Sequence, residues 1–201
     1  MESAPYSDLT PDRALDALAA VGLRPDGRLL ALNSYENRVY QAWMEDGPAL
    51  VAKFYRPARW SDAQILEEHA FAQELAEREI PVVAPLAPAG ATLHEFQGFR
   101  FAVYPRRGGR TPELEDSKTL EWLGRFIGRI HAVGETAGFR ERPRLDIESH
   151  GIEPRDWLLA SGLVPPDLLE AWKSATALAL DGVRRCYERA GIVKAIRLHG
   201  D

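Results

Sequence analysis

Apolar residues recur with helical spacing after two strong helix-start signals in the first half of the chain. Thr10 precedes a proline and an acid, and the short apolar helix that follows ends at Gly22, because a hydroxyl N-cap and an early proline suit a first helical turn. Ser61 and Gln64 match the capping box, in which each side chain satisfies a free backbone donor. The apolar stripe that begins there extends until Pro81 prevents its continuation.

Alternating and short apolar runs predict four strands around the second of these helices. Residues 38–43 and the run "LVAKFYR" form a hairpin across an acidic turn, and "TLHEF" and "GFRFAVYP" form another around Gln97 and Gly98. The resulting order of helix, two strands, helix and two strands is that of an α+β lobe, which we place at residues 1–104.

The pattern changes in the second half, residues 105–201, which we expect to be mainly helical. A connector rich in proline, glycine and charge, "PRRGGRTPELED", leads into an apolar helix that Gly134 ends. A second helix is expected from Pro165 to about Ala190. The closing run "IVKAIRL" predicts a final strand that leads directly into His199, Gly200 and Asp201.

Composition and charge narrow the function classes. The net charge of −5 gives no reason to expect a nucleic-acid binder, and no segment approaches the roughly 18 apolar residues of a membrane span. The N-terminus lacks the basic start and apolar run of a signal peptide. A single cysteine, Cys186, excludes an internal disulfide. We therefore expect a cytoplasmic protein without nucleic-acid or membrane partners, with a monomer favoured.

Lys53 and Glu68 form the first candidate for chemistry. A lone lysine in a half-buried strand is usually a packed stem with its ammonium in water, and an acid on an amphipathic helix is usually solvated. Together, a strand lysine and an acid 15 residues later in the next helix match the ion pair that positions nucleotide phosphates in kinases.

Two further segments complete the candidate site. The turn "LNSYENRVYQ" occupies the place of a kinase phosphate loop but contains no glycine, so from its spacing alone it could equally be a plain hairpin turn. At the other end of the chain, Asp201 could be a simple acid and His199 a core histidine. A carboxylate presented after an apolar strand also suits a base that accepts a proton from a substrate hydroxyl.

These segments, in order, resemble a known family. "LNSYENRVYQ", "VAKFYRPARW", "QILEEHAFAQEL", "QGFRFAVYP", "GRIHAVG", "IEPRDWL" and "RLHGD" are similar to the bacterial stress response kinase A family, a branch of the aminoglycoside phosphotransferase and choline kinase superfamily. The resemblance covers nearly the whole chain and implies a two-lobed eukaryotic-like protein kinase fold. It also implies ATP with Mg²⁺ as cofactors and transfer of phosphate to serine or threonine hydroxyls of a protein substrate, linked to stress survival.

The resemblance also implies roles for individual residues. Lys53 binds the phosphates and Glu68 holds it, while Asp201 is the catalytic base. The phosphate loop and the adenine-binding hinge are expected at two short segments: Ser34, Tyr35, Glu36 and Asn37 for the loop, and Ala102, Val103 and Tyr104 for the hinge.

One difference between this sequence and the family pattern affects the activity that we expect. The family motif that begins at His199 continues to an asparagine and a later aspartate that bind metal, so we expect no metal ligand within residues 1–201 and a large lobe that is incomplete. The 201-residue chain alone is therefore predicted to be inactive, with apolar surfaces near Ile127 and Leu178 partly uncovered. Two alternatives stay open: a small-molecule kinase acting on an amino alcohol, sugar or aminoglycoside, and a non-catalytic nucleotide-binding module.

Overall fold

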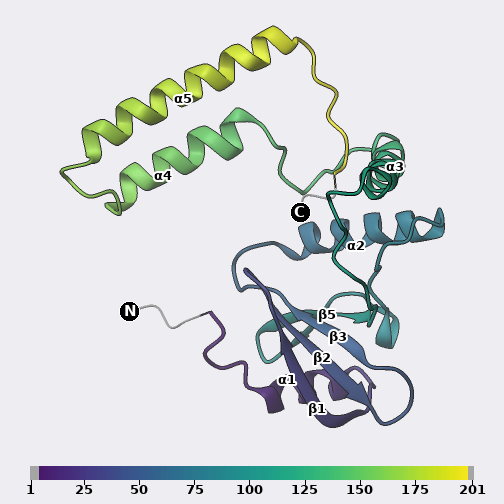
Figure 1. Cartoon of the computed structure of the whole chain (residues 1–201). Helices are drawn as coiled ribbons and strands as arrows, with labels where there is room; N and C mark the ends of the chain where they lie inside the picture. The colour runs from purple at the N-terminus through teal and green to yellow at the C-terminus, as the bar shows by residue number, and fades with distance from the viewer. Residues whose placement is uncertain (1–4, 199–201) are drawn as a thin grey trace. The chain divides into compact units, whose positions relative to one another are not determined.

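The computed structural model describes residues 5–198 (Figure 1). Contacts divide the chain into two compact units, Met1–Val133 and Gly134–Asp201. This division falls later than the change in composition after Tyr104, because most of helix α3 (Ser117–Gly134) belongs to the first unit. The assignment of residues 1–104 and 105–201 to the two lobes of a kinase stays a prediction.

The first unit is built on one antiparallel sheet of five strands in the order β1-β2-β3-β5-β4. The four predicted strands are confirmed, and their bounds are Arg38–Met44 for β2, Leu50–Phe54 for β3, His94–Phe96 for β4 and Phe99–Pro105 for β5. The edge strand β1, Pro25–Leu32, was not predicted. Its proline, aspartate and glycine at the start resemble a turn, and most of its residues are exposed.

The two faces of the sheet have different environments because successive side chains on a strand alternate. Ala52 and Phe54 of β3 join the core on the face that helix α1 (Pro11–Ala20) covers, where Phe54 stacks on Phe101 with centroids 5.3 Å apart. Lys53 and its cross-strand neighbours Val39 and Ala102 lie on the opposite face. Helix α2 (Asp62–Glu77) packs there through Ile65.

The caps that set the starts of α1 and α2 form as predicted. Helix α1 is Pro11–Ala20, and the Thr10 side chain accepts a hydrogen bond from the Arg13 N–H. Helix α2 is Asp62–Glu77, and both bonds of the capping box between Ser61 and Gln64 are present. These two helices lie on opposite sides of the sheet (Figure 1). Local sequence signals therefore set where these two helices begin.

The second unit contains a short π-helical turn, Glu148–Ile152, and helices α4, Glu153–Ser161, and α5, Leu169–Ala190. Helix α5 agrees with the predicted helix, whereas α4 was not predicted. The strand expected from "IVKAIRL" is wrong, because residues 193–198 form no helix or strand. This segment is instead held by a hydrogen bond from the Arg197 N–H to the Gly134 carbonyl, 3.2 Å long.

Apolar surface is exposed in both units. Ile127 on α3 is 51% exposed and Leu178 on α5 is 71% exposed, as expected from the sequence. Within residues 5–198, none of the helices combines the length and the hydrophobicity that a membrane span needs.

Candidate nucleotide-binding site

Lys53 and Glu68 form an ion pair between β3 and α2. The Lys53 Nζ lies 3.3 Å from Glu68 Oε1, with side chains 25% and 38% exposed. The predicted contact is confirmed, and it follows from local structure. Because side chains alternate along a strand, Lys53 points away from the core that α1 covers. Glu68 directly precedes the buried His69 on α2, the helix that packs on the same face as Lys53.

Aromatic side chains surround this pair. The Lys53 ammonium also lies 4.8 Å from the centroid of the Tyr55 ring, a distance at which the ring face attracts a cation. Tyr55 is 2% exposed and packs with Ile65 and Ala102. The Lys53 ammonium is therefore held by two contacts, one ionic and one aromatic.

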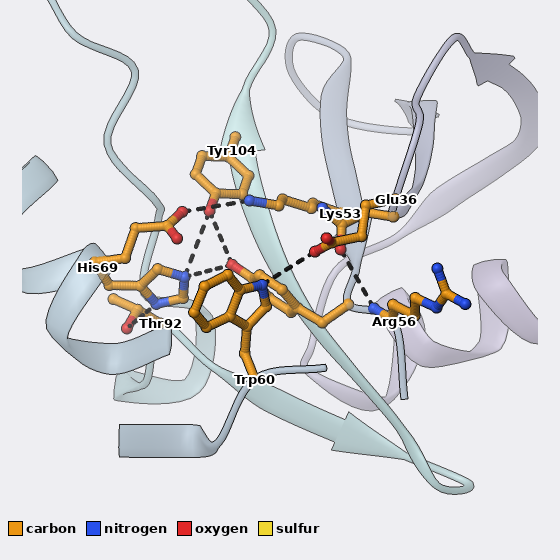
Figure 2. A network of polar contacts seen from close by, with 10 residues as sticks. Glu36, Lys53, Arg56, Trp60, His69, Thr92 and Tyr104 are labelled. Atoms are coloured by element: carbon orange, nitrogen blue, oxygen red, sulfur yellow. Dashed lines mark hydrogen bonds and ion pairs between the residues drawn. The ribbon is translucent and has the colours of Figure 1, made fainter. Parts of the chain in front are cut away.

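A buried polar network lies beside the pair and was not found from the sequence. His69 is 1% exposed, and its Nε2 lies 2.7 Å from the Tyr55 hydroxyl and 3.4 Å from the Tyr104 hydroxyl. Its Nδ1 lies 2.9 Å from Thr92 Oγ1. Figure 2 shows these side chains converging from α2, β5 and the segment before β4. His69 lies four residues after Ile65, which places both residues on one face of α2, but this spacing alone does not show that a histidine there is buried.

Burial changes the protonation of this network. Desolvation lowers the pKa of His69 to about 4; the Glu68 charge raises it by a smaller amount, and Lys53 and His94 lower it slightly further. Desolvation also raises the pKa of Tyr104 to about 12. The imidazole is therefore neutral at pH 7, with one nitrogen that donates and one that accepts. That pattern suits hydroxyl partners on both sides of the ring.

The predicted phosphate loop connects β1 to β2, and its side chains have unequal surroundings. Ser34 donates a 2.6 Å hydrogen bond to the Asn37 carbonyl, and Asn37 Oδ1 accepts a 3.3 Å bond from the Arg56 N–H. Tyr35 is fully exposed. The Glu36 carboxylate points to Trp60, as Figure 2 shows. The loop thus has its own side-chain hydrogen bonds in place of glycine.

The predicted adenine-binding segment lies inside β5. Ala102 and Tyr104 pair with Lys53 and Val51 of β3, and the Val103 carbonyl accepts a 2.7 Å bond from the Leu86 N–H. The chain leaves regular structure only after Pro105. These residues therefore lie next to Lys53 on the sheet, but their backbone groups are largely used in pairing.

The catalytic base was predicted at Asp201, which lies outside the described residues, as does His199. Within residues 5–198, no three His, Cys, Asp or Glu side chains group closely enough to hold a metal ion. The roles of Asp201 and of the metal ligands therefore stay predictions.

The chain belongs to the phosphotransferase enzyme family, whose sequence model matches residues 28–201. Among curated proteins it resembles stress response kinase A of Escherichia coli (strain K12), with 44% identity over 98% of this chain and 59% of that protein. It also resembles the serine/threonine protein kinase RdoA of Salmonella typhimurium (strain LT2), at 42% identity with the same coverage. The chain thus spans about 59% of the length of these curated relatives.

Solved structures agree on the fold. An amicoumacin kinase, hAmiN, in complex with AMP-PNP, Ca²⁺ and Ami aligns with a TM-score of 0.67 and 19% identity, covering 88% of this chain and 53% of that chain. A microcompartment-associated aminopropanol kinase aligns with a TM-score of 0.64 and 18% identity, covering 88% and 57%. The predicted α+β fold of aminoglycoside phosphotransferase type is confirmed.

Proposed function

We propose that this protein is an ATP-dependent serine/threonine protein kinase of the stress-response type. It would act in the cytoplasm and transfer the γ-phosphate of ATP to hydroxyls of a protein substrate. The observation that carries the proposal is the Lys53–Glu68 ion pair on the α2 face of the sheet. Family membership and the similarity to two proteins named as kinases support it.

The described residues fit a nucleotide chemically. A triphosphate needs a fixed positive charge, and Lys53 supplies one whose direction is set by Glu68 and by the Tyr55 ring. The loop of residues 34–37 would cover the phosphates with its backbone. Adenine would lie against Val51 and the chain around Tyr104, which are neighbours on β3 and β5. Asp201 would accept the proton of the substrate hydroxyl.

Mg²⁺ would neutralise charge that develops on the phosphate oxygens when it is bound. The residues of this chain would perform the remaining work. Lys53 would orient the phosphates, and the buried Tyr55 and partly buried Tyr104 would reduce the access of water to that electrostatic contact. Because Lys53 lies on a strand and Glu68 on a packed helix, the pair would be ordered before the nucleotide binds.

The test is phosphoryl transfer by the product of the complete gene. Incubation with radiolabelled ATP and Mg²⁺ should label the protein itself or an added protein substrate on serine or threonine. Lys53→Ala should abolish the labelling. Absence of any nucleotide binding by the folded wild-type protein would refute the proposal.

A small-molecule kinase is the second candidate, because the two solved structures described above are named for small-molecule substrates. Those similarities show the fold alone. A panel of amino alcohols, sugars and aminoglycosides, offered with labelled ATP, separates the candidates. Labelled small molecules without labelled protein would favour this second function, and nucleotide binding without transfer would favour a non-catalytic module.

A further inference from the structure

Glu36 is the one acidic residue in the predicted phosphate loop. An ionised carboxylate has no hydrogen to donate and repels phosphate oxygens. Burial alone would raise the pKa of Glu36, but hydrogen bonds from Arg59 and Trp60 lower it below its ordinary value. The side chain is therefore charged at neutral pH and unsuited to contact a triphosphate.

The structure gives this carboxylate another use. Glu36 Oε1 accepts a 3.0 Å hydrogen bond from the Trp60 indole N–H, and Oε2 accepts one of 3.0 Å from Arg59 Nε. Arg59 itself lies over the Trp60 ring, 4.9 Å from its centroid. Both carboxylate oxygens are thus occupied by the segment between β3 and α2, and Figure 2 shows the contact with Trp60.

The backbone of Glu36 is also held. Its carbonyl accepts a 3.0 Å hydrogen bond from the Tyr6 hydroxyl, which lies 3.3 Å from the Phe54 carbonyl as well. Tyr6 packs against the α1 core. One loop residue is therefore fixed from two sides, by its side chain and by its main chain.

Trp60, which donates to the Glu36 carboxylate, connects this loop to the rest of the proposed site. Trp60 packs against the buried cluster of Tyr55, Ile65 and Ala102. It directly precedes Ser61, the N-cap of α2, and α2 carries Glu68. The Glu36–Trp60 contact therefore links the loop over the phosphates to the helix that holds Lys53.

We propose that Glu36 is a positioning residue that fixes the glycine-free phosphate loop to the start of α2, and that it does not itself contact the nucleotide. This inference rests on the proposed function. Loops that use glycine reach the phosphates through an unusually free backbone. Here the loop would be held in place in advance, so less conformational entropy would be lost when ATP binds.

The experiment uses the product of the complete gene and two measurements. The first is the KM for ATP and the kcat of Glu36→Ala, Glu36→Gln, Trp60→Phe and the double variant Glu36→Ala/Trp60→Phe. The second is hydrogen exchange of the amides of residues 33–38. Glu77→Gln, an exposed acid at the end of α2, is the control for loss of one negative charge.

Glu36→Ala should raise the KM for ATP about tenfold, with a smaller change in kcat, because the hydrogen bonds that its carboxylate accepts from Arg59 and Trp60 are lost. Glu36→Gln should retain part of the affinity, since its amide oxygen can still accept from Trp60. The double variant should be no worse than Glu36→Ala, because both changes break the same contact. Amide exchange in the loop should accelerate in each variant and stay unchanged in Glu77→Gln.

Three outcomes would overturn the inference. Unchanged loop exchange in Glu36→Ala would show that the contact does not order the loop. Faster exchange with an unchanged KM would show that loop order does not position the nucleotide. A wild-type protein that binds no ATP would refute the inference and the proposed function together, whereas ATP binding that depends on Lys53 but not on Glu36 would refute the inference alone.

Discussion

The Lys53 ammonium and the Glu68 carboxylate meet at 3.3 Å although they come from different elements, strand β3 and helix α2. Neither side chain is deeply buried, with exposed fractions of 25% and 38%. Ion pairs with this exposure contribute little to folding, typically about 0–1 kcal/mol. The pair is better explained by the positioning of a charge than by stability, and the two roles can be measured separately.

Lys53→Ala should lower kcat/KM for ATP by roughly 100-fold or more. The substitution removes the positive charge that would stabilise negative charge developing on the transferred phosphate. The free energy of unfolding should change by less than about 1 kcal/mol. Steady-state kinetics and chemical denaturation of the complete gene product measure the two effects. Lys118→Ala, at an exposed position of α3, is the matched control and should change neither. A large loss of stability in Lys53→Ala would indicate a structural role.

His69 should titrate far below an ordinary histidine. Its ring signals in NMR, assigned by comparison with His69→Gln, should show a pKa near 4. Because this folded-state value lies below the unfolded value of about 6.5, the unfolded state binds a proton first as the pH falls. The stability associated with the neutral ring is therefore complete above pH 6.5 and is lost as the pH falls towards 4.

The same shift can be measured by denaturation. Between pH 7 and pH 4.5 the wild type should lose roughly 2–3 kcal/mol more than His69→Gln. His94 also has a lowered pKa, caused by its burial, and it contributes equally to both proteins. Equal pH dependence of the two proteins, or a ring that titrates near 6.5, would contradict the buried neutral state.

Tyr55→Phe should destabilise the first unit by about 1–3 kcal/mol, because it leaves the buried His69 without its 2.7 Å hydroxyl partner. The Tyr104 hydroxyl, 3.1 Å from that of Tyr55, loses a partner as well. Thermal unfolding followed by circular dichroism measures the change. Tyr35→Phe removes a hydroxyl from a fully exposed side chain and should stay within about 0.5 kcal/mol of the wild type.

The turn between β4 and β5 offers a stabilising change. Gln97 and Gly98 both have positive φ, 49° and 83°, and they connect the paired residues Phe96 and Phe99. A two-residue turn of this kind favours Asn-Gly. Gln97→Asn should therefore raise the free energy of unfolding by about 0.5 kcal/mol.

Gly98→Ala is the opposite change in the same turn. A Cβ at this φ is strained although no neighbouring atom would touch it, so the expected loss is about 1–2 kcal/mol. Thermal unfolding of the two variants should therefore shift in opposite directions. A rise in stability for Gly98→Ala would exclude the left-handed turn.

Local signals in the sequence were sufficient to predict much of the structure of the first unit. The caps at Thr10 and Ser61 predicted the starts of α1 and α2, since their hydroxyls bond only to nearby backbone. The distance between Lys53 and Glu68 along the chain, combined with the family resemblance, predicted their contact. These features depend on a few adjacent residues or on the order of two elements.

Other features depended on contacts that no local pattern contains. The run at residues 193–198 is mostly apolar and partly β-branched, yet it forms no strand, because a strand needs a partner with free backbone groups. Strand β1 was hidden by its turn-like start, and pairing with β2 defines it. His69 shares the face of Ile65, but a polar residue on that face signals burial only when its hydroxyl partners are known.

The Tyr6 hydroxyl, bonded to the Glu36 and Phe54 carbonyls, has a practical consequence for handling the protein. Tyr6 lies before the first helix, in a region that is often removed when a protein is trimmed for expression or is cut by a protease. A preparation that starts after Thr10 would keep all of the side chains proposed to face ATP, yet its proposed phosphate loop would lack one anchor. Affinities for ATP measured on trimmed protein would then understate those of the intact chain.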